Sequence, residues 1–411
     1  MRCKTTRILA TLIILSYIPG CGGGGGGGGG NNGGGNPPPV VPPPPAVQSG
    51  VFKDANVVGL DYVSGAQSGT TGSDGHFSCE TGKAVSFAVG AVELGSAQCT
   101  TLLSPAALVA GGAFDDPKAV NIARFLQLLD VDAMPDNNIS ISSGLQAVAD
   151  SWPAIDFDAA DLDSQLTMVF SDIQSVDNRT VNAAPDAMTA FAHMDETLAC
   201  AYGGAFIGTL SGTNTGSVAF VTGRGFAGFA DNEFSFMAFD PDETFLISTG
   251  GEFDLSANSV IDSSAFDPSV IVKADFSTPD TLSGTWTYPP ESRSGTLSAF
   301  RLGDGNGIVR MVGEFAAFES RGVLSISVDA AGVFSGEAFD ISDNSTYQIS
   351  GPRPLSNPFN LTISGNGTSF TASATLASDS SGVIRLTGSW DDGTQTGAQF
   401  QANYCILNPL P

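Results

Sequence analysis

The sequence predicts a mainly β protein with a small helical segment. Glycine is abundant, with 51 residues, while charged residues make up only 14% of the chain. From Tyr202 onward apolar and polar residues alternate, with turn residues about every eight to twelve positions, which is typical of an antiparallel sandwich or barrel. Helical spacing of apolar residues is confined to 106–199. We therefore expect an N-terminal β-sandwich, a helical middle and a C-terminal antiparallel β-barrel or sandwich.

Residues 1–20 have the features of an export signal. Arg2, Lys4 and Arg7 precede a short apolar run, which is too short for the roughly 20 residues that span a bilayer and fits a signal peptide. Ile18-Pro19-Gly20-Cys21 resembles the lipobox of bacterial lipoproteins. The resemblance implies that Cys21 becomes the acylated first residue and that the lipid bilayer is a partner. The alternative is an ordinary secretory signal in which Cys21 is incidental.

The residue after Cys21 is Gly22, not Asp. In lipoproteins of Gram-negative bacteria this resembles the pattern for export to the outer membrane. We expect a lipid-anchored protein that faces the cell surface, with the periplasmic face as the alternative. Residues 21–50 contain nine consecutive glycines and then a proline-rich run to Pro45, a composition typical of a disordered tether that cannot form a core.

The charge of the chain narrows the class of possible partners, and its cysteines indicate disulfide bonds. The chain has 42 acidic and 16 basic residues and a net charge of −26, which argues against nucleic acid as a partner. After Cys3 and Cys21, four cysteines remain, and an even number in an exported chain indicates two disulfides with three possible pairings. We favour Cys79 with Cys99, which are close in sequence, and Cys200 with Cys405. Zinc is disfavoured because the chain has no CxxC and only two histidines.

Residues 51–105 read as short strands separated by glycine-rich turns. The run from Thr71 to Lys83, Thr-Gly-Ser-Asp-Gly-His-Phe-Ser-Cys-Glu-Thr-Gly-Lys, resembles the turn of carboxypeptidase-regulatory-like β-sandwiches. The resemblance implies a small sandwich that acts as a non-catalytic spacer or binding unit. A plain hairpin with a glycine-rich turn is the alternative.

Residues 106–199 contain three apolar stripes at helical spacing. Asp116 followed by Pro117 predicts a helix start, and the stripe then continues to Leu129. Further helices are predicted over Leu162–Ile173 and Pro185–Ala199. We expect this helical segment to pack on the preceding sandwich.

Three carboxylates between the first two predicted helices could bind calcium. Asp130, Asp132 and Asp136 offer the oxygen ligands that this ion prefers. However, Met134 and Pro135 stand where a calcium loop needs an oxygen ligand and a turn glycine. A polar turn that caps a helix end is therefore the favoured interpretation, and no other cofactor is expected.

The β-rich C-terminal half repeats. Gly216–Phe220 aligns with Gly322–Ile326, Phe226–Gly228 with Phe334–Gly336, Leu282–Trp286 with Leu386–Trp390, and Gly295 with Gly397. We expect two modules, 200–306 and 307–411, which form either one closed structure or two. Their glycine-spaced strands resemble the barrels of transferrin-binding and haem-binding surface lipoproteins. The resemblance implies binding of proteins through loops, without catalytic residues.

The sequence thus favours a non-catalytic cell-envelope lipoprotein that presents β modules for binding or adhesion to an extracellular protein or glycan. One alternative is a carrier of a small apolar ligand, which requires a barrel cavity lined by Phe and Trp. A second is a glycan-acting hydrolase with paired carboxylates, although neither G-x-S-x-G nor H-E-x-x-H occurs. The loop tips Asp231–Asn232 and Asp391–Gly393 are candidates for ligand binding by position alone.

Overall fold

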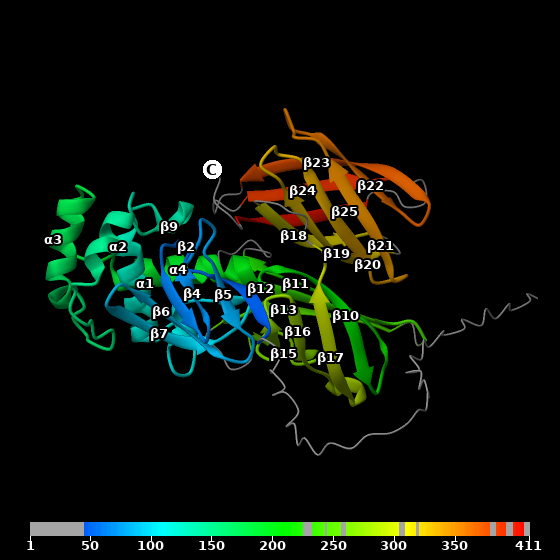
Figure 1. Ribbon diagram of the computed structural model, residues 1–411. Coiled ribbons are helices and arrows are strands. Elements are labelled where there is room, and N and C mark those ends of the chain that lie inside the picture. Colours follow the sequence, from blue (N-terminus) through cyan, green and yellow to red (C-terminus); the bar gives the residue numbers. More distant parts are fainter. Residues whose placement is uncertain are drawn as a thin grey trace, which may run out of the picture. The chain divides into compact units, whose positions relative to one another are not determined.

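The computed structural model confirms a mainly β fold with a small helical part (Figure 1). It describes residues 45–224, 232–242, 245–255, 260–303, 309–317, 320–378, 384–391 and 398–406. The signal segment, Cys21 and the glycine-rich stretch therefore lie outside the described residues, as do Asp231, Asp392, Gly393, Phe226 and Gly397.

The N-terminal part contains two small sheets. One has the order β5-β1-β8 and the other β4-β3-β6-β7, while β2 pairs with β9. The strands are β1 Val47–Phe52, β2 Val57–Val58, β3 Asp61–Ser64, β4 Gln67–Thr70, β5 His76–Glu80, β6 Ala84–Val89, β7 Val92–Gln98, β8 Leu102–Leu103 and β9 Ile139–Ser140. The first strand begins at Val47, within the stretch expected to be tether.

Four α-helices follow or interrupt these strands: α1 Pro117–Leu129, α2 Ser143–Ala149, α3 Thr167–Val176 and α4 Ala187–Tyr202. Short 3₁₀ turns cover Pro105–Leu108, Pro135–Asn137, Asp163–Gln165 and Pro289–Glu291. The predicted start of α1 is correct, because the Asp116 carboxylate accepts a hydrogen bond from the Lys118 N–H at 2.8 Å. Side chains of α1, α2 and α3 share one core with the small sheets, where Phe125 lies near Phe157 and Trp152.

The first module forms an eight-stranded antiparallel sheet with the order β13-β12-β11-β10-β17-β16-β15-β14. Its strands are β10 Gly204–Gly212, β11 Gly216–Arg224, β12 Asn232–Asp240, β13 Phe245–Glu252, β14 Ile261–Asp262, β15 Ile271–Thr278, β16 Thr281–Tyr288 and β17 Arg293–Arg301. An isolated β-bridge between Phe253, just after β13, and Ile261 of β14 links the two edges of this sheet. Met194 and Leu198 of α4 belong to its core.

The second module closes completely into a barrel. Its strands run in sequence order: β18 Val309–Ala316, β19 Arg321–Val328, β20 Phe334–Asp340, β21 Ser345–Gly351, β22 Phe359–Gly365, β23 Thr368–Ser378, β24 Ile384–Trp390 and β25 Ala398–Ile406. Closure comes from pairing of the first strand with the last, in register from Val309–Ile406 to Ala316–Gln399. Since neither strand is left as an edge, the interior is enclosed by paired strands all round.

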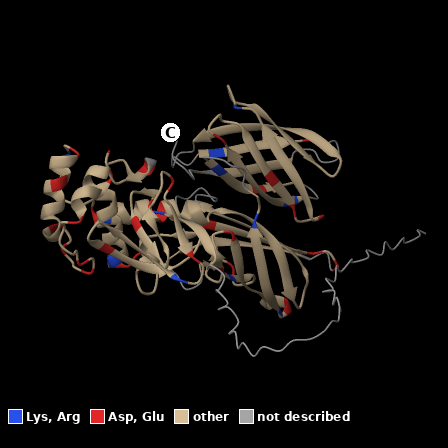
Figure 2. Ribbon diagram, viewed as in Figure 1, with Lys and Arg blue, Asp and Glu red and all other residues tan. Residues whose placement is uncertain are grey.

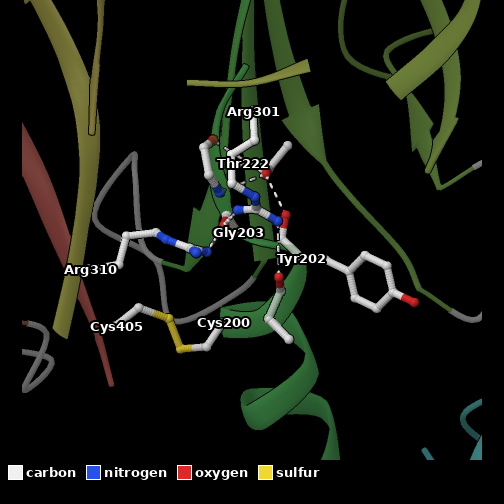
Figure 3. The surroundings of a disulfide bond; sticks show 9 residues. Cys200, Tyr202, Gly203, Thr222, Arg301, Arg310 and Cys405 are labelled. Atoms are coloured by element: carbon white, nitrogen blue, oxygen red, sulfur yellow. Dashed lines mark hydrogen bonds between the residues drawn. A yellow bond between two sulfur atoms is a disulfide. The ribbon is translucent and has the colours of Figure 1, made fainter. Parts of the chain in front are cut away.

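The end of α4 is held by a disulfide and by two arginines (Figure 3). Cys200 is bonded to Cys405 of β25, with 5.5 Å between their Cα atoms. Arg301 donates to the carbonyls of Ala201 and Gly203, and Arg310 donates to the Gly203 carbonyl at 2.8 Å. These cations lie where the helix leaves carbonyl groups without intrahelical partners, so they satisfy the helix end and complement its dipole.

Asp and Glu residues are distributed over many elements of the described part of the chain, as Figure 2 shows. Within the same residues, no helix is both long and apolar enough to cross a membrane.

Candidate ligand-binding cavity

The barrel of β18–β25 contains a cavity of about 430 Å³. This volume lies within the range of small-molecule pockets, roughly 300–1,000 Å³. The barrel core includes the small side chains of Ala338, Ala372, Ala374 and Ala402, all of which are buried, and Ala338 lines the cavity. Every described residue of that core belongs to a strand, so no helix fills the space.

The first module is filled instead. Phe206, Phe220, Phe236 and Trp286 are among the largest fully buried side chains of the described residues. They share a core with residues of α4. Two modules with the same number of strands therefore differ inside, because the core of the first includes side chains of α4, whereas the described core of the second comes from strands alone.

One end of the barrel carries the polar residues of the cavity. Strands alternate in direction, so β18, β20, β22 and β24 end where β19, β21, β23 and β25 begin. The polar lining residues lie at that end, or in the turns that join these strands: Ser320, Asp340, Ser342, Asp343, Asn366 and Thr368. Further inside, the lining is aliphatic, with Leu324, Ile326, Ala338, Ile349, Leu361 and Ile363. The cavity thus has a polar mouth and an apolar interior.

Aromatic rings form one continuous wall near this mouth. The Trp390 ring centroid lies 5.4 Å from that of Phe315, 6.2 Å from Phe370 and 6.0 Å from Phe400. The Tyr347 ring lies 6.4 Å from Phe370. These five residues come from five different strands, and all of them line the cavity. An aromatic wall of this kind suits a ligand with a flat or apolar body.

Asp340 is the buried carboxylate of the mouth. Only 5% of the residue is exposed. Its carboxylate accepts hydrogen bonds from the Ser320 hydroxyl and, at 2.8 Å, from the Ser342 N–H. Burial raises the pKa of Asp340, and these hydrogen bonds only partly oppose the shift.

The cysteines predicted to pair do so in the structure. Cys79 is bonded to Cys99, with 5.7 Å between Cα atoms, and Cys200 to Cys405. Cys79 is fully buried in the core of the N-terminal sheets. Both bonds lie away from the cavity lining and act as cross-links.

Two of the three aspartates considered for calcium accept hydrogen bonds within a turn in this structure. Asp130 and Asp132 both accept the Met134 N–H, at 2.8 and 2.9 Å. Burial raises the pKa of Asp130 to about 6. The Oδ1 atom of Asp136 instead lies 3.6 Å from Nε2 of His193. Within the described ranges, no group of three or more His, Cys, Asp or Glu residues is positioned to hold a metal ion.

Sequence reasoning missed a buried ion pair next to this turn. Asp54 is fully buried, and its Oδ1 atom lies 3.0 Å from Nδ1 of His193 in α4. Gln127 of α1 donates to both oxygens of the same carboxylate at 3.2 Å. The pair spans 139 positions of sequence, and no local pattern relates residues so far apart. It joins the turn after β1 to two helices and is a structural contact.

The comparisons with known proteins add little. No family model and no curated protein matches the chain. Among solved structures, kievitone hydratase from Nectria haematococca is similar over 52% of this chain and 92% of its own, with 10% identity and a TM-score of 0.20. At that TM-score the likeness carries no argument about fold or activity.

Proposed function

We propose that this chain is a non-catalytic, lipid-anchored protein of the cell envelope that carries a small molecule in its C-terminal barrel. The observation that supports this function is the cavity of about 430 Å³ lined by five aromatic rings. An aromatic-lined cavity in place of a packed core is what a carrier requires, and it favours this function over adhesion through loops.

A sugar-cleaving activity is less well supported by the same cavity. Glycans need many hydrogen-bonding partners, whereas most of the described lining is aromatic or aliphatic. The polar groups are confined to the mouth. The chemistry of the lining therefore suits retention of an apolar body better than hydrolysis of a sugar chain.

The anchor gives the carrier its location. By its resemblance to a lipobox, Cys21 would tie the protein to the outer membrane, and the glycine- and proline-rich stretch would hold the folded part away from the lipid. A carrier placed in this way would act at the outer surface or in the periplasm.

The test is binding of a neutral amphipathic probe, 4-phenylbutan-1-ol, to the chain without its signal segment (residues 22–411). We expect saturable one-to-one binding by calorimetry, together with a change in the emission of Trp390. Ala338→Phe should fill the cavity and abolish binding, because Ala338 lines it. Ala331→Phe is the matched control, since Ala331 lies in the exposed turn between β19 and β20. Absence of saturable binding, or equal binding by both variants, would contradict the proposal.

A further inference from the structure

The charge at the cavity mouth has one sign. Asp340 and Asp343 both line the cavity, and the described lining residues include no Lys, Arg or His. Asp343 lies in the turn between β20 and β21 and is exposed, whereas Asp340 is buried at the end of β20. A ligand that enters here meets two carboxylates before it reaches the aromatic wall.

Two other buried carboxylates among the described residues have a basic partner. Glu80, 1% exposed, forms an ion pair with Lys83 at 2.6 Å, and Asp54 pairs with His193 at 3.0 Å. Asp340 instead accepts from a hydroxyl and a backbone N–H among the described residues, as the buried Asp130 accepts from two backbone N–H groups. A buried carboxylate with neutral donors alone is costly to ionise, and a cation in the cavity would offset that cost.

The aromatic wall favours the same class of ligand. The faces of aromatic rings carry negative potential and attract ammonium groups within about 6 Å of the ring centre. Trp390, the most effective ring type for this purpose, stands at the centre of the wall and lies near Phe315, Phe370 and Phe400. The strongly acidic chain, with a net charge of −26, would also attract cations to the mouth from a distance.

We propose that the ligand of this barrel is an organic cation, with an ammonium group held by Asp340 and Asp343 at the mouth and an apolar or aromatic body against the rings of Trp390 and its neighbours. This inference rests on the proposed carrier function and names its ligand class. The ammonium donates to the carboxylate of Asp340, which is the deeper of the two acids. The aliphatic side chains further inside the cavity contact the end of the ligand that is far from the ammonium group.

The experiment compares three probes of matched size and different charge: 4-phenylbutylamine, 4-phenylbutan-1-ol and 4-phenylbutyrate. Each is titrated into residues 22–411 by calorimetry at neutral pH. A hydrogen bond to a charged group is worth more than a neutral one, so we expect the amine to bind about tenfold tighter than the alcohol. The carboxylate should bind weakest, and the preference for the amine should shrink as salt is added.

Substitutions then test whether the two aspartates at the mouth bind the ammonium group. Asp340→Asn keeps an acceptor for the Ser342 N–H and should weaken amine binding about tenfold while leaving alcohol binding within about twofold. Asp343→Asn, at an exposed position, should weaken the amine less and provides a second test if the first variant does not fold. Asp329→Asn is the matched control, because Asp329 lies in the exposed β19–β20 turn at the other end of the barrel.

The outcomes separate the two proposals. Equal affinity for amine and alcohol, or amine binding unaffected by both Asp340→Asn and Asp343→Asn, would overturn the cationic ligand and leave the carrier function standing. Failure of all three probes to bind would overturn the carrier function itself. Preferred binding of the amine that is lost in Asp340→Asn but kept in Asp329→Asn is the expected result.

Discussion

Asp240 and Asp340 end the third strands of the two modules in the same way. Asp240 is the last residue of β12 and Asp340 the last of β20. Each accepts a hydrogen bond from the backbone N–H two residues ahead: that of Asp242 at 2.9 Å and that of Ser342 at 2.8 Å. Each is also buried. The two modules therefore share a turn in which a buried aspartate closes the strand.

The second oxygen of each carboxylate extends this correspondence. It accepts from a side chain just before the second strand of its own module, the Asn214 amide at 2.7 Å in the first and the Ser320 hydroxyl in the second. The structural contact thus repeats although the donor type changes. In the barrel this same aspartate lines a cavity, so an element of turn structure is placed where it can contact a ligand.

The acid at the mouth predicts how binding depends on pH. Burial raises the pKa of Asp340, and only its ionised form attracts a cation. Affinity for 4-phenylbutylamine should therefore be full above this raised pKa and fall as pH drops through it, starting at a higher pH than for an ordinary aspartate of pKa about 3.9. Calorimetry across a pH series measures this. Asp340→Asn should lose most of the pH dependence, and an unchanged profile in that variant would contradict the assignment.

Substitution of the two aligned tryptophans by alanine should affect different properties, stability in the first module and ligand binding in the second. Trp286 is 1% exposed and packs in the filled core of the first module, so Trp286→Ala should lower the free energy of unfolding by about 3–5 kcal/mol. Trp390 is half-buried beside the cavity, so Trp390→Ala should cost clearly less stability but abolish probe binding. Urea unfolding and calorimetry on the same two proteins provide both readouts. A larger loss of stability for Trp390→Ala would show that its module is packed like the first.

The buried pair of Asp54 and His193 predicts a pH-dependent stability. Burial alone would lower the pKa of His193, but the hydrogen bond and charge of Asp54 outweigh it and raise that pKa. While Asp54, whose pKa burial raises, stays ionised, the stabilisation is present below the unfolded histidine pKa of about 6.5, and it is lost as pH rises through the raised folded value of His193. His193→Ala should cost about 3 kcal/mol, because it leaves a fully buried carboxylate without its cation.

The measurement is urea unfolding between pH 6 and 9. His193→Gln should remove the decline in stability over this interval. His76→Gln is the control, since His76 is the only other histidine in the sequence and lies exposed beside Asp74. A wild-type profile that stays flat above pH 6.5, or one that His76→Gln flattens equally, would contradict the role given to His193.

The sequence predicted those parts of the fold that depend on local patterns. Alternation and turn residues indicated the β-rich C-terminal half, and Asp116-Pro117 marked the start of α1 correctly. Helix α2 was not predicted, because a seven-residue helix that buries only Leu145 and Ala149 leaves too short a periodic pattern.

The cavity depends on relations between strands, which no local pattern contains. Ala338 is unremarkable in sequence, and it lines a cavity only because closure of the barrel turns its strand toward a common interior. The aromatic wall likewise collects one residue from each of five strands. The carrier alternative could be stated from the sequence, but choosing it required the closed barrel and the small residues inside it.

The disulfide between Cys200 and Cys405 predicts a large cost on removal. It spans 205 positions of sequence, against 20 for Cys79–Cys99. In the chain-entropy account longer loops give more stabilisation, typically about 2–4 kcal/mol. Cys200→Ser with Cys405→Ser should therefore lower the free energy of unfolding more than Cys79→Ser with Cys99→Ser, as measured by urea unfolding. The opposite order would indicate that Arg301 and Arg310 suffice to hold the end of α4.

The proposed lipid anchor predicts where the protein is found. Cys21→Ser should release the protein from the membrane fraction, because the acyl chains would no longer be attached. Protease added to intact cells should cleave the wild-type protein rapidly if its folded part faces outward, and only after disruption of the outer membrane if it faces the periplasm. Immunoblotting of fractionated cells measures both. Ser16→Ala, five positions before Cys21 in the signal segment, is the control and should leave retention unchanged. Membrane retention of Cys21→Ser at the wild-type level would remove the lipid anchor from the proposal while leaving the barrel cavity and its ligand open to the binding tests above.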